Sequence, residues 1–162
     1  KINATQSQFT EVISGFSAGV ISNNSSIKIR FMDLETKDIV TKFYESNFYK
    51  DEEVLKAFLH PDVELRWYGT TGFRKLNLDG ISEITKEISE SYESLRAETE
   101  KIISNGNEAA IHFTYFVRTI ENPEEEMPLA HFVAMWELKD GKLYKGTQVS
   151  QLGEEIDDDP WS

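Results

Sequence analysis

Residues 95–152 hold the pattern that most restricts the fold: alternating apolar and polar residues interrupted by short turns. The dipeptides Asn105-Gly106 and Asp140-Gly141 are typical of two-residue hairpin turns, and the polar stretch 121–128 indicates a wide loop. Strands joined in this way run antiparallel and pair with their sequence neighbours. The pattern therefore predicts four antiparallel strands, at residues 95–104, 109–120, 129–139 and 143–152.

The first half of the chain shows helical spacing instead. Apolar residues within 39–48 fall on one face of a helix, for which Asp33 or Thr36 is the expected N-cap. A second helix is predicted at residues 51–59, where the apolar positions repeat at the same spacing. His60-Pro61 follows directly, so we expect His60 to lie at the C-terminus of this helix.

A short strand and a third helix complete the first half. Val63, Leu65 and Trp67 alternate as a strand requires. The third helix is predicted to begin near Asp79-Gly80, with an apolar face made of Ile81, Ile84, Ile88 and Leu95. Helices that precede a run of antiparallel strands indicate an α+β fold.

Hairpin geometry assigns side chains to the two faces of the sheet. A two-residue turn at Asp140-Gly141 pairs Lys139 with Lys142, and a loop centred in 121–128 places Phe113 opposite Trp136. One face then carries Ile111, Phe113, Tyr115, Phe132, Ala134, Trp136 and Leu138. This face is strongly apolar, so we expect it to meet the helices.

The opposite face is mixed in character. It carries His112, Thr114, Phe116, Arg118, His131, Val133, Met135 and Glu137. A face turned to water would show cleaner polar alternation. We therefore expect it to be covered, most simply by a second copy of the chain in a homodimer.

The chain has 3 histidines, and two of them fall on this outer face. His131 and His112 could form a polar site with Arg118 and Glu137, although a cross-strand network at the outer surface is the simpler interpretation. No histidines stand at ligand spacing, so we predict no metal. No glycine-rich phosphate loop or serine elbow is present, so we predict no cofactor.

Charge and cysteine content narrow the function further. The formal net charge is −12, from 29 acidic and 17 basic residues. This balance argues against nucleic acid and anionic membranes as partners. No apolar run approaches the roughly 20 residues of a membrane helix. The chain has 0 cysteines, which excludes disulfide and thiolate chemistry and fits a cytoplasmic location.

Composition also divides the chain. Residues 1–31 are rich in Ser and Asn, and we interpret them as an N-terminal extension, non-native or derived from an upstream start. The domain is expected at residues 32–153, where helix and strand patterns are clear. Residues 154–162 form an acidic tail.

Four stretches of this domain carry a family resemblance. They are DIVTKFYESNFYKDEEVLKAFLHPDVELRWYG (38–69), LDGISEITKEI (78–88), AAIHFTYFV (109–117) and VAMWELKDGKLYKG (133–146). In order and spacing they resemble the SnoaL-like branch of the nuclear transport factor 2-like superfamily, which includes ketosteroid isomerases and polyketide cyclases. The resemblance implies a cystatin-like cone, in which a curved antiparallel sheet wraps around three N-terminal helices and encloses an apolar pocket.

The resemblance also identifies the positions where relatives keep catalytic groups. The general base of ketosteroid isomerases aligns with Trp67, and their oxyanion donors align with Phe43 and Ala134. The acid of SnoaL-like cyclases also falls at Ala134. These side chains cannot transfer a proton, so the chain lacks both inherited acid/base sets.

Three hypotheses follow. The first is a binder of a small apolar or aromatic molecule, with a pocket lined by Phe43, Trp67, Phe113, Tyr115, Ala134 and Trp136. The second is an isomerase, cyclase or hydratase that uses a relocated acid/base, with His131, His112 and Tyr44 as candidates. The third is a protein-interaction module that uses the outer sheet face.

Overall fold

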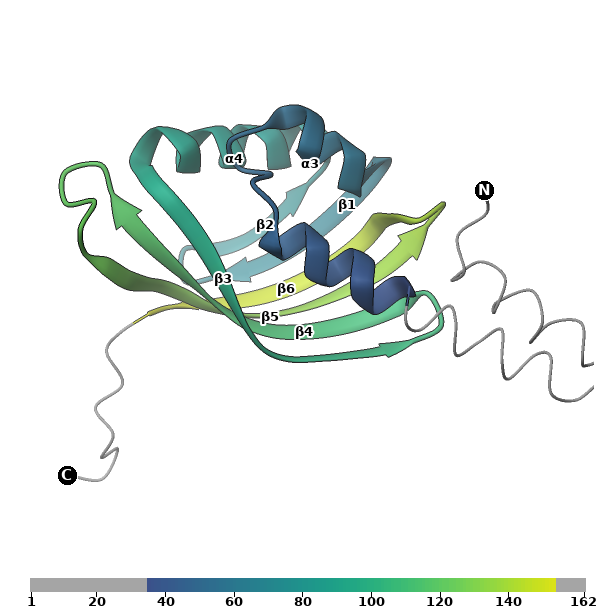
Figure 1. Ribbon diagram of the computed structural model, residues 1–162. Helices are drawn as coiled ribbons and strands as arrows, with labels where there is room; N and C mark the ends of the chain where they lie inside the picture. The colour runs from purple at the N-terminus through teal and green to yellow at the C-terminus, as the bar shows by residue number, and fades with distance from the viewer. Residues whose placement is uncertain (1–34, 154–162) are drawn as a thin grey trace, which may run out of the picture.

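A strongly curved sheet with helices on its concave side forms the fold (Figure 1). The computed structural model describes residues 35–153, so the predicted extension 1–31 and tail 154–162 lie outside the described residues. The described elements are a helical segment at 35–45, α3 (Glu52–Phe58), β1 (Leu59–Gly69), β2 (Gly72–Leu76), α4 (Leu78–Ser91), β3 (Tyr92–Asn105), β4 (Glu108–Thr119), β5 (Glu126–Lys139) and β6 (Lys142–Leu152). The predicted α+β class is confirmed.

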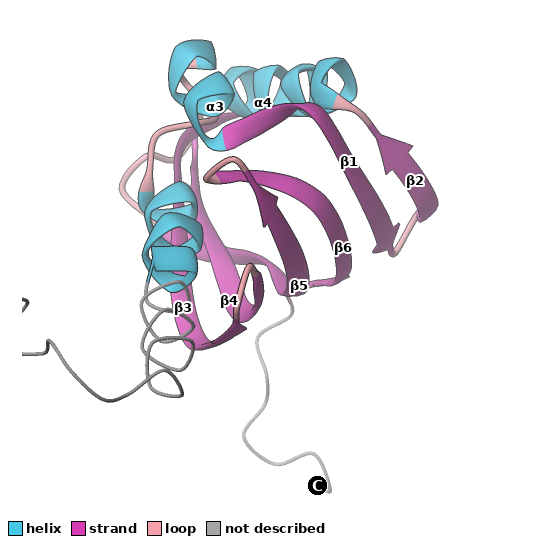
Figure 2. Ribbon diagram, turned by 90° about the vertical axis from the view of Figure 1, so that its right-hand side faces the viewer, coloured by secondary structure: helices cyan, strands magenta, loops and turns pink. Residues whose placement is uncertain are grey.

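The strand order is β2-β1-β6-β5-β4-β3. Strands β3 to β6 form the predicted antiparallel series, but β1 pairs with β6 in parallel, so the sheet is mixed. Figure 2 shows the sheet curling around the helices, as a cone requires. No helix in the described part is long and apolar enough to cross a membrane.

Strand β2 was absent from the sequence prediction. It pairs with β1 through a turn closed by Gly69 and Gly72, and Gly72 has a φ of 114°, which favours glycine. The strand is short, and four of its five residues are exposed at the sheet edge. Because neither of its faces is buried, its sequence shows no apolar alternation to detect.

The helix boundaries correct three details of the prediction. Asn77, not the Asp79-Gly80 pair, caps α4 by accepting a hydrogen bond from the Gly80 amide at 3.0 Å. Leu95 lies in β3 rather than in that helix. Thr36 lies within the first helical segment, where its hydroxyl donates to the Gly106 carbonyl at 2.8 Å instead of capping the helix.

His60 does not lie at a helix end. Helix α3 ends at Phe58, and Leu59 is already extended. Pro61 in turn disfavours the helical region for His60, the residue directly before it. His60 is buried within β1, and its Nδ1 accepts a hydrogen bond from the Asp62 amide at 3.0 Å. Its Nε2 therefore carries the ring proton, and it faces Asp140 Oδ2 at 3.5 Å.

The predicted registers were right at one turn and wrong at two. Lys139 pairs with Lys142 as expected, but a bulge then places Trp136 opposite Gly146. Phe113 pairs with Phe132, four residues from the predicted Trp136, because the loop after β4 turns earlier than assumed. The β3–β4 turn consists of Gly106 and Asn107, since Asn105 pairs with Glu108.

The faces survive the register error because a shift by an even number of residues keeps each side chain on its side. The predicted inner face is buried or half-buried throughout, with Phe113 and Ala134 fully enclosed. Phe113 and Phe132 stack across the strands with ring centroids 5.2 Å apart. On the outer face Val133 and Met135 are about half exposed.

Candidate functional site

A cavity of about 400 Å³ lies between the concave face of the sheet and the helices. This volume is within the range of small-molecule sites. The 35–45 segment, α4 and all six strands contribute to its wall. The wall is rich in aromatic side chains: Phe43, Tyr44, Phe48, Trp67, Tyr92, Tyr115, Phe132 and Trp136.

The structure gathers most of the predicted pocket residues around this cavity. Phe43, Trp67, Tyr115 and Trp136 line it directly. Phe113 and Ala134 are fully buried in the layer behind the wall and do not line the cavity. Of the three acid/base candidates, Tyr44 alone belongs to the wall of this cavity.

Tyr44 and Trp136 form a buried pair at the inner end of the wall. The Trp136 Nε1–H donates to the Tyr44 hydroxyl oxygen at 2.8 Å. Burial raises the pKa of Tyr44 well above its ordinary value, and the hydrogen bond from Trp136 offsets this only in part. Tyr44 is therefore a neutral phenol whose oxygen is occupied and whose proton is available for donation.

Tyr115 presents a second phenol. Its ring packs against Phe113 and Phe132, with centroid distances of 4.9 and 5.3 Å. Burial raises its pKa well above the ordinary value, and the nearby Tyr44 adds to the effect. Within residues 35–153 the Tyr115 hydroxyl forms no hydrogen bond. Because Tyr115 lines the cavity, its hydroxyl can form a hydrogen bond with a ligand or water there.

A polar row crosses β2, β1 and β6 on the inner face. Arg74 pairs with Trp67, and Trp67 pairs with Gln148 on its other side. The Trp67 Nε1–H donates to Ser150 Oγ at 2.8 Å, which fixes the indole against the wall. All four side chains line the cavity. Sequence reasoning missed all three partners of Trp67. Arg74 reaches it through the unpredicted strand β2, and Gln148 and Ser150 reach it through the parallel pairing of β1 with β6.

The cavity lining contains one carboxylate among the described residues, Glu87 of α4. Apart from Glu87 and Arg74, the polar groups of this lining are neutral hydroxyl, indole and amide groups.

His131 and His112 lie on the outer face, outside the cavity. His131 Nδ1 and Thr114 Oγ1 are 2.8 Å apart, and Thr114 Oγ1 donates to Glu100 at 3.3 Å. His112 Nδ1 lies 3.2 Å from the other Glu100 oxygen. The network is thus built on Thr114 and Glu100, not on the expected Arg118 and Glu137, because the register differs. The described residues contain no cluster suited to a metal ion.

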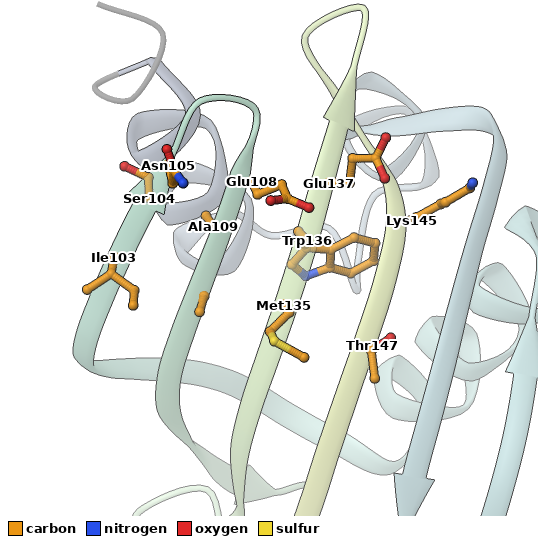
Figure 3. Close-up of a pocket in the computed structure, with 11 residues that line it drawn as sticks. Ile103, Ser104, Asn105, Glu108, Ala109, Met135, Trp136, Glu137, Lys145 and Thr147 are labelled. Atoms are coloured by element: carbon orange, nitrogen blue, oxygen red, sulfur yellow. The ribbon is translucent and has the colours of Figure 1, made fainter. Parts of the chain in front are cut away.

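A second pocket, of about 430 Å³, lies on the outer face near the β3–β4 turn. Figure 3 shows Ile103, Met135 and Thr147 on β3, β5 and β6, across the width of the pocket, with Glu137 and Lys145 toward one end. Its lining combines small, apolar and charged side chains of the outer face with Trp136 of the inner face. The pocket therefore lies on the outer face, for which the sequence predicts a partner.

The sequence model of the SnoaL-like domain matches residues 40–145. No curated protein matches the chain. Solved structures under 25% identical establish the likeness of the fold alone.

Three of these structures show the range of proteins that share this fold. IdmH, a candidate polyketide cyclase from Streptomyces antibioticus, is 16% identical with a TM-score of 0.58, over 72% of this chain and 91% of that one. An LEH-like epoxide hydrolase from M. tuberculosis is 13% identical with a TM-score of 0.57, over 74% and 84%. TerC, co-crystallised with polyporic acid, is 22% identical with a TM-score of 0.54, over 74% and 92%.

Proposed function

Since the chain belongs to the SnoaL-like domain family, we propose that it binds a small apolar or aromatic molecule in the inner cavity. Its fold is the nuclear transport factor 2-like fold, whose structural neighbours here are small-molecule enzymes. The proposed function is ligand binding in the pocket, without the proton-transfer chemistry of ketosteroid isomerases and polyketide cyclases.

The cavity itself carries the proposal. Its volume of about 400 Å³ lies between aromatic rings that hydrogen bonds hold in place, the buried bond from Trp136 to Tyr44 and the partly buried bond from Trp67 to Ser150. Such fixed indole rings offer flat apolar surface to a ring-shaped ligand. The partnerless Tyr115 hydroxyl supplies a hydrogen bond for one polar atom of that ligand. The TerC structure with polyporic acid is a related case in which a small molecule was bound.

A fluorescent apolar probe tests the proposal. N-phenyl-1-naphthylamine should bind with enhanced emission, and Ala130→Leu, which places a larger side chain in the cavity wall, should weaken its binding about tenfold. Ala110→Leu is the matched control, because Ala110 lines the outer pocket instead. Loss of binding in the control but not in Ala130→Leu would refute the proposal, as would the absence of probe binding to the folded wild-type protein.

The enzyme hypothesis now depends on Tyr44. Its raised pKa keeps the proton on the phenol, so Tyr44 would donate a hydrogen bond to a substrate oxygen rather than act as a base. An isomerase or hydratase of this kind would lose turnover in Tyr44→Phe while still binding the probe. Turnover that is unaffected by Tyr44→Phe but abolished in His131→Ala would exclude this role.

We also propose that the outer face forms a homodimer. Large exposed side chains cross it, each about half exposed: Ile103, Met135, Val133, Val149, Tyr68 and Phe73. A patch of this kind is unusual on a monomer. Met135→Asp should shift the sedimenting species toward a monomer, whereas Ile120→Asp, equally exposed beyond the end of β4, should not. A wild-type monomer at high concentration would contradict the dimer.

A further inference from the structure

We propose that the ligand of the inner cavity is an aromatic acid, whose anionic group pairs with Arg74 at the mouth while its ring lies against Trp67. This inference rests on the proposed function and names the chemical class of the ligand. It depends on the inner-face row Arg74, Trp67 and Gln148.

Arg74 is directed toward the cavity by strand geometry. It is the cross-strand partner of Trp67, and opposed residues share a face of the sheet. Its guanidinium carbon lies 5.8 Å from the centroid of the Trp67 ring, at a distance typical of a cation over an aromatic face. Arg74 also belongs to the lining of the cavity, although it remains exposed to solvent. It therefore stands at the mouth of the cavity.

The charge of Arg74 is not matched by a protein carboxylate. Its neighbours Arg66 and Lys75, on the outer face, both pair with Glu64, at 3.2 and 2.8 Å. Within residues 35–153 Arg74 forms neither an ion pair nor a hydrogen bond. Glu87, the one carboxylate of the described lining, does not approach it to within the 4.0 Å of an ion pair. The protein thus pairs the outer cations of these two strands and leaves the inner one available.

Gln148 supplies the second observation. It is only 9% exposed, it lines the cavity, and its side-chain amide forms no hydrogen bond within the described residues. The amide atoms themselves are accessible from the cavity, so a ligand bound there can form hydrogen bonds with them. Because Gln148 and Arg74 flank Trp67 from opposite sides, a flat ring on the indole could carry polar groups toward each.

An anion fits this row better than a neutral ligand does. A guanidinium binds carboxylate or sulfonate oxygens through paired, charge-assisted hydrogen bonds. The chain as a whole has a net charge of −12, which repels anions at long range. An acid that enters the cavity therefore needs a local cation at the mouth, and Arg74 provides one beside the aromatic wall.

Two fluorescent probes with one ring framework separate charge from ring binding. 8-Anilinonaphthalene-1-sulfonate carries a sulfonate that N-phenyl-1-naphthylamine lacks. Arg74→Gln should weaken binding of the sulfonate about tenfold and change binding of the neutral probe by less than about twofold. Lys75→Gln is the matched control, because it removes the same charge from the adjacent residue on the outer face. It should leave both affinities within about twofold.

The outcomes distinguish this inference from the proposed function. Suppose that the neutral probe binds in the cavity, but Arg74→Gln and Lys75→Gln change the affinity for the sulfonate probe equally. The inference that the ligand is an aromatic acid is then refuted, while the proposed small-molecule site is still supported. If neither probe binds the folded protein, the proposed function fails. Glu87→Gln adds a test of sign, since removing the exposed carboxylate of the lining should strengthen sulfonate binding. Weaker binding in that variant would also overturn the inference.

Discussion

Replacing Gly146 by alanine should destabilise the protein strongly, although it adds a single methyl group. A Cβ at this position would lie 2.6, 2.7 and 2.8 Å from three ring atoms of Trp136. Ordinary contacts at a Cβ begin near 3.4 Å, so the indole must withdraw by roughly 1 Å. The ring is 3% exposed and held by its hydrogen bond to Tyr44, so it has little room to move.

The magnitude follows from these two constraints. Overpacking a core by a methyl group costs about 1 to 3 kcal/mol. Breaking the Trp136–Tyr44 hydrogen bond and leaving both groups buried costs about 1 to 3 kcal/mol more. Gly→Ala also makes the unfolded chain less flexible, which raises the free energy of unfolding by about 0.4 to 1 kcal/mol. We therefore expect Gly146→Ala to lower the free energy of unfolding by about 1 to 6 kcal/mol.

Guanidinium unfolding followed by far-ultraviolet circular dichroism measures this change. The same substitution in a Trp136→Leu background is the control, because the ring that the new methyl group meets is then absent. There Gly146→Ala should be neutral or slightly stabilising. An equal loss of stability in both backgrounds, or none in the wild-type background, would refute the steric argument. If Gly146→Ala alone does not fold, recovery of folding in the double variant supports it.

Further predictions concern the phenols and one turn. Tyr44→Phe should lower the free energy of unfolding by about 1 to 3 kcal/mol, because it leaves the Trp136 Nε1–H buried without an acceptor. Tyr115→Phe, measured by the same unfolding assay, should not destabilise the protein, because its hydroxyl has no partner to lose. Both phenols have a pKa raised by burial, so the folded state resists their ionisation while the unfolded state does not. Their contribution to stability is complete below the ordinary tyrosine pKa of about 10 and declines above it. Absorbance at 295 nm should then show two of the 6 tyrosines ionising only as the protein unfolds. Asp140 has a φ of 54°, so in denaturant titrations Asp140→Ala should cost about 1 kcal/mol relative to Asp140→Gly.

The sheet faces could be predicted because they depend on local periodicity. Side chains alternate along a strand whatever its partner, so the inner position of Phe113, Tyr115 and Trp136 did not require the correct register. The Asp140-Gly141 turn was equally local, since both residues adopt positive φ values. The same reasoning identified Trp67 and Phe43 as inward-facing aromatic residues, and both line the cavity.

The composition of the site required the tertiary structure. Strand β2 has no buried face, so no local pattern marked it, and Arg74 was overlooked with it. Gln148 meets Trp67 only through the parallel β1–β6 pair, which joins residues about eighty positions apart. The outer location of His131 and His112 followed from alternation, but their partners Thr114 and Glu100 depended on a bulge in β3. The sequence alone determined which side chains face inward, because alternation is a property of each strand. Which of them meet around the cavity was decided by strand order and register, which arise from contacts between distant segments.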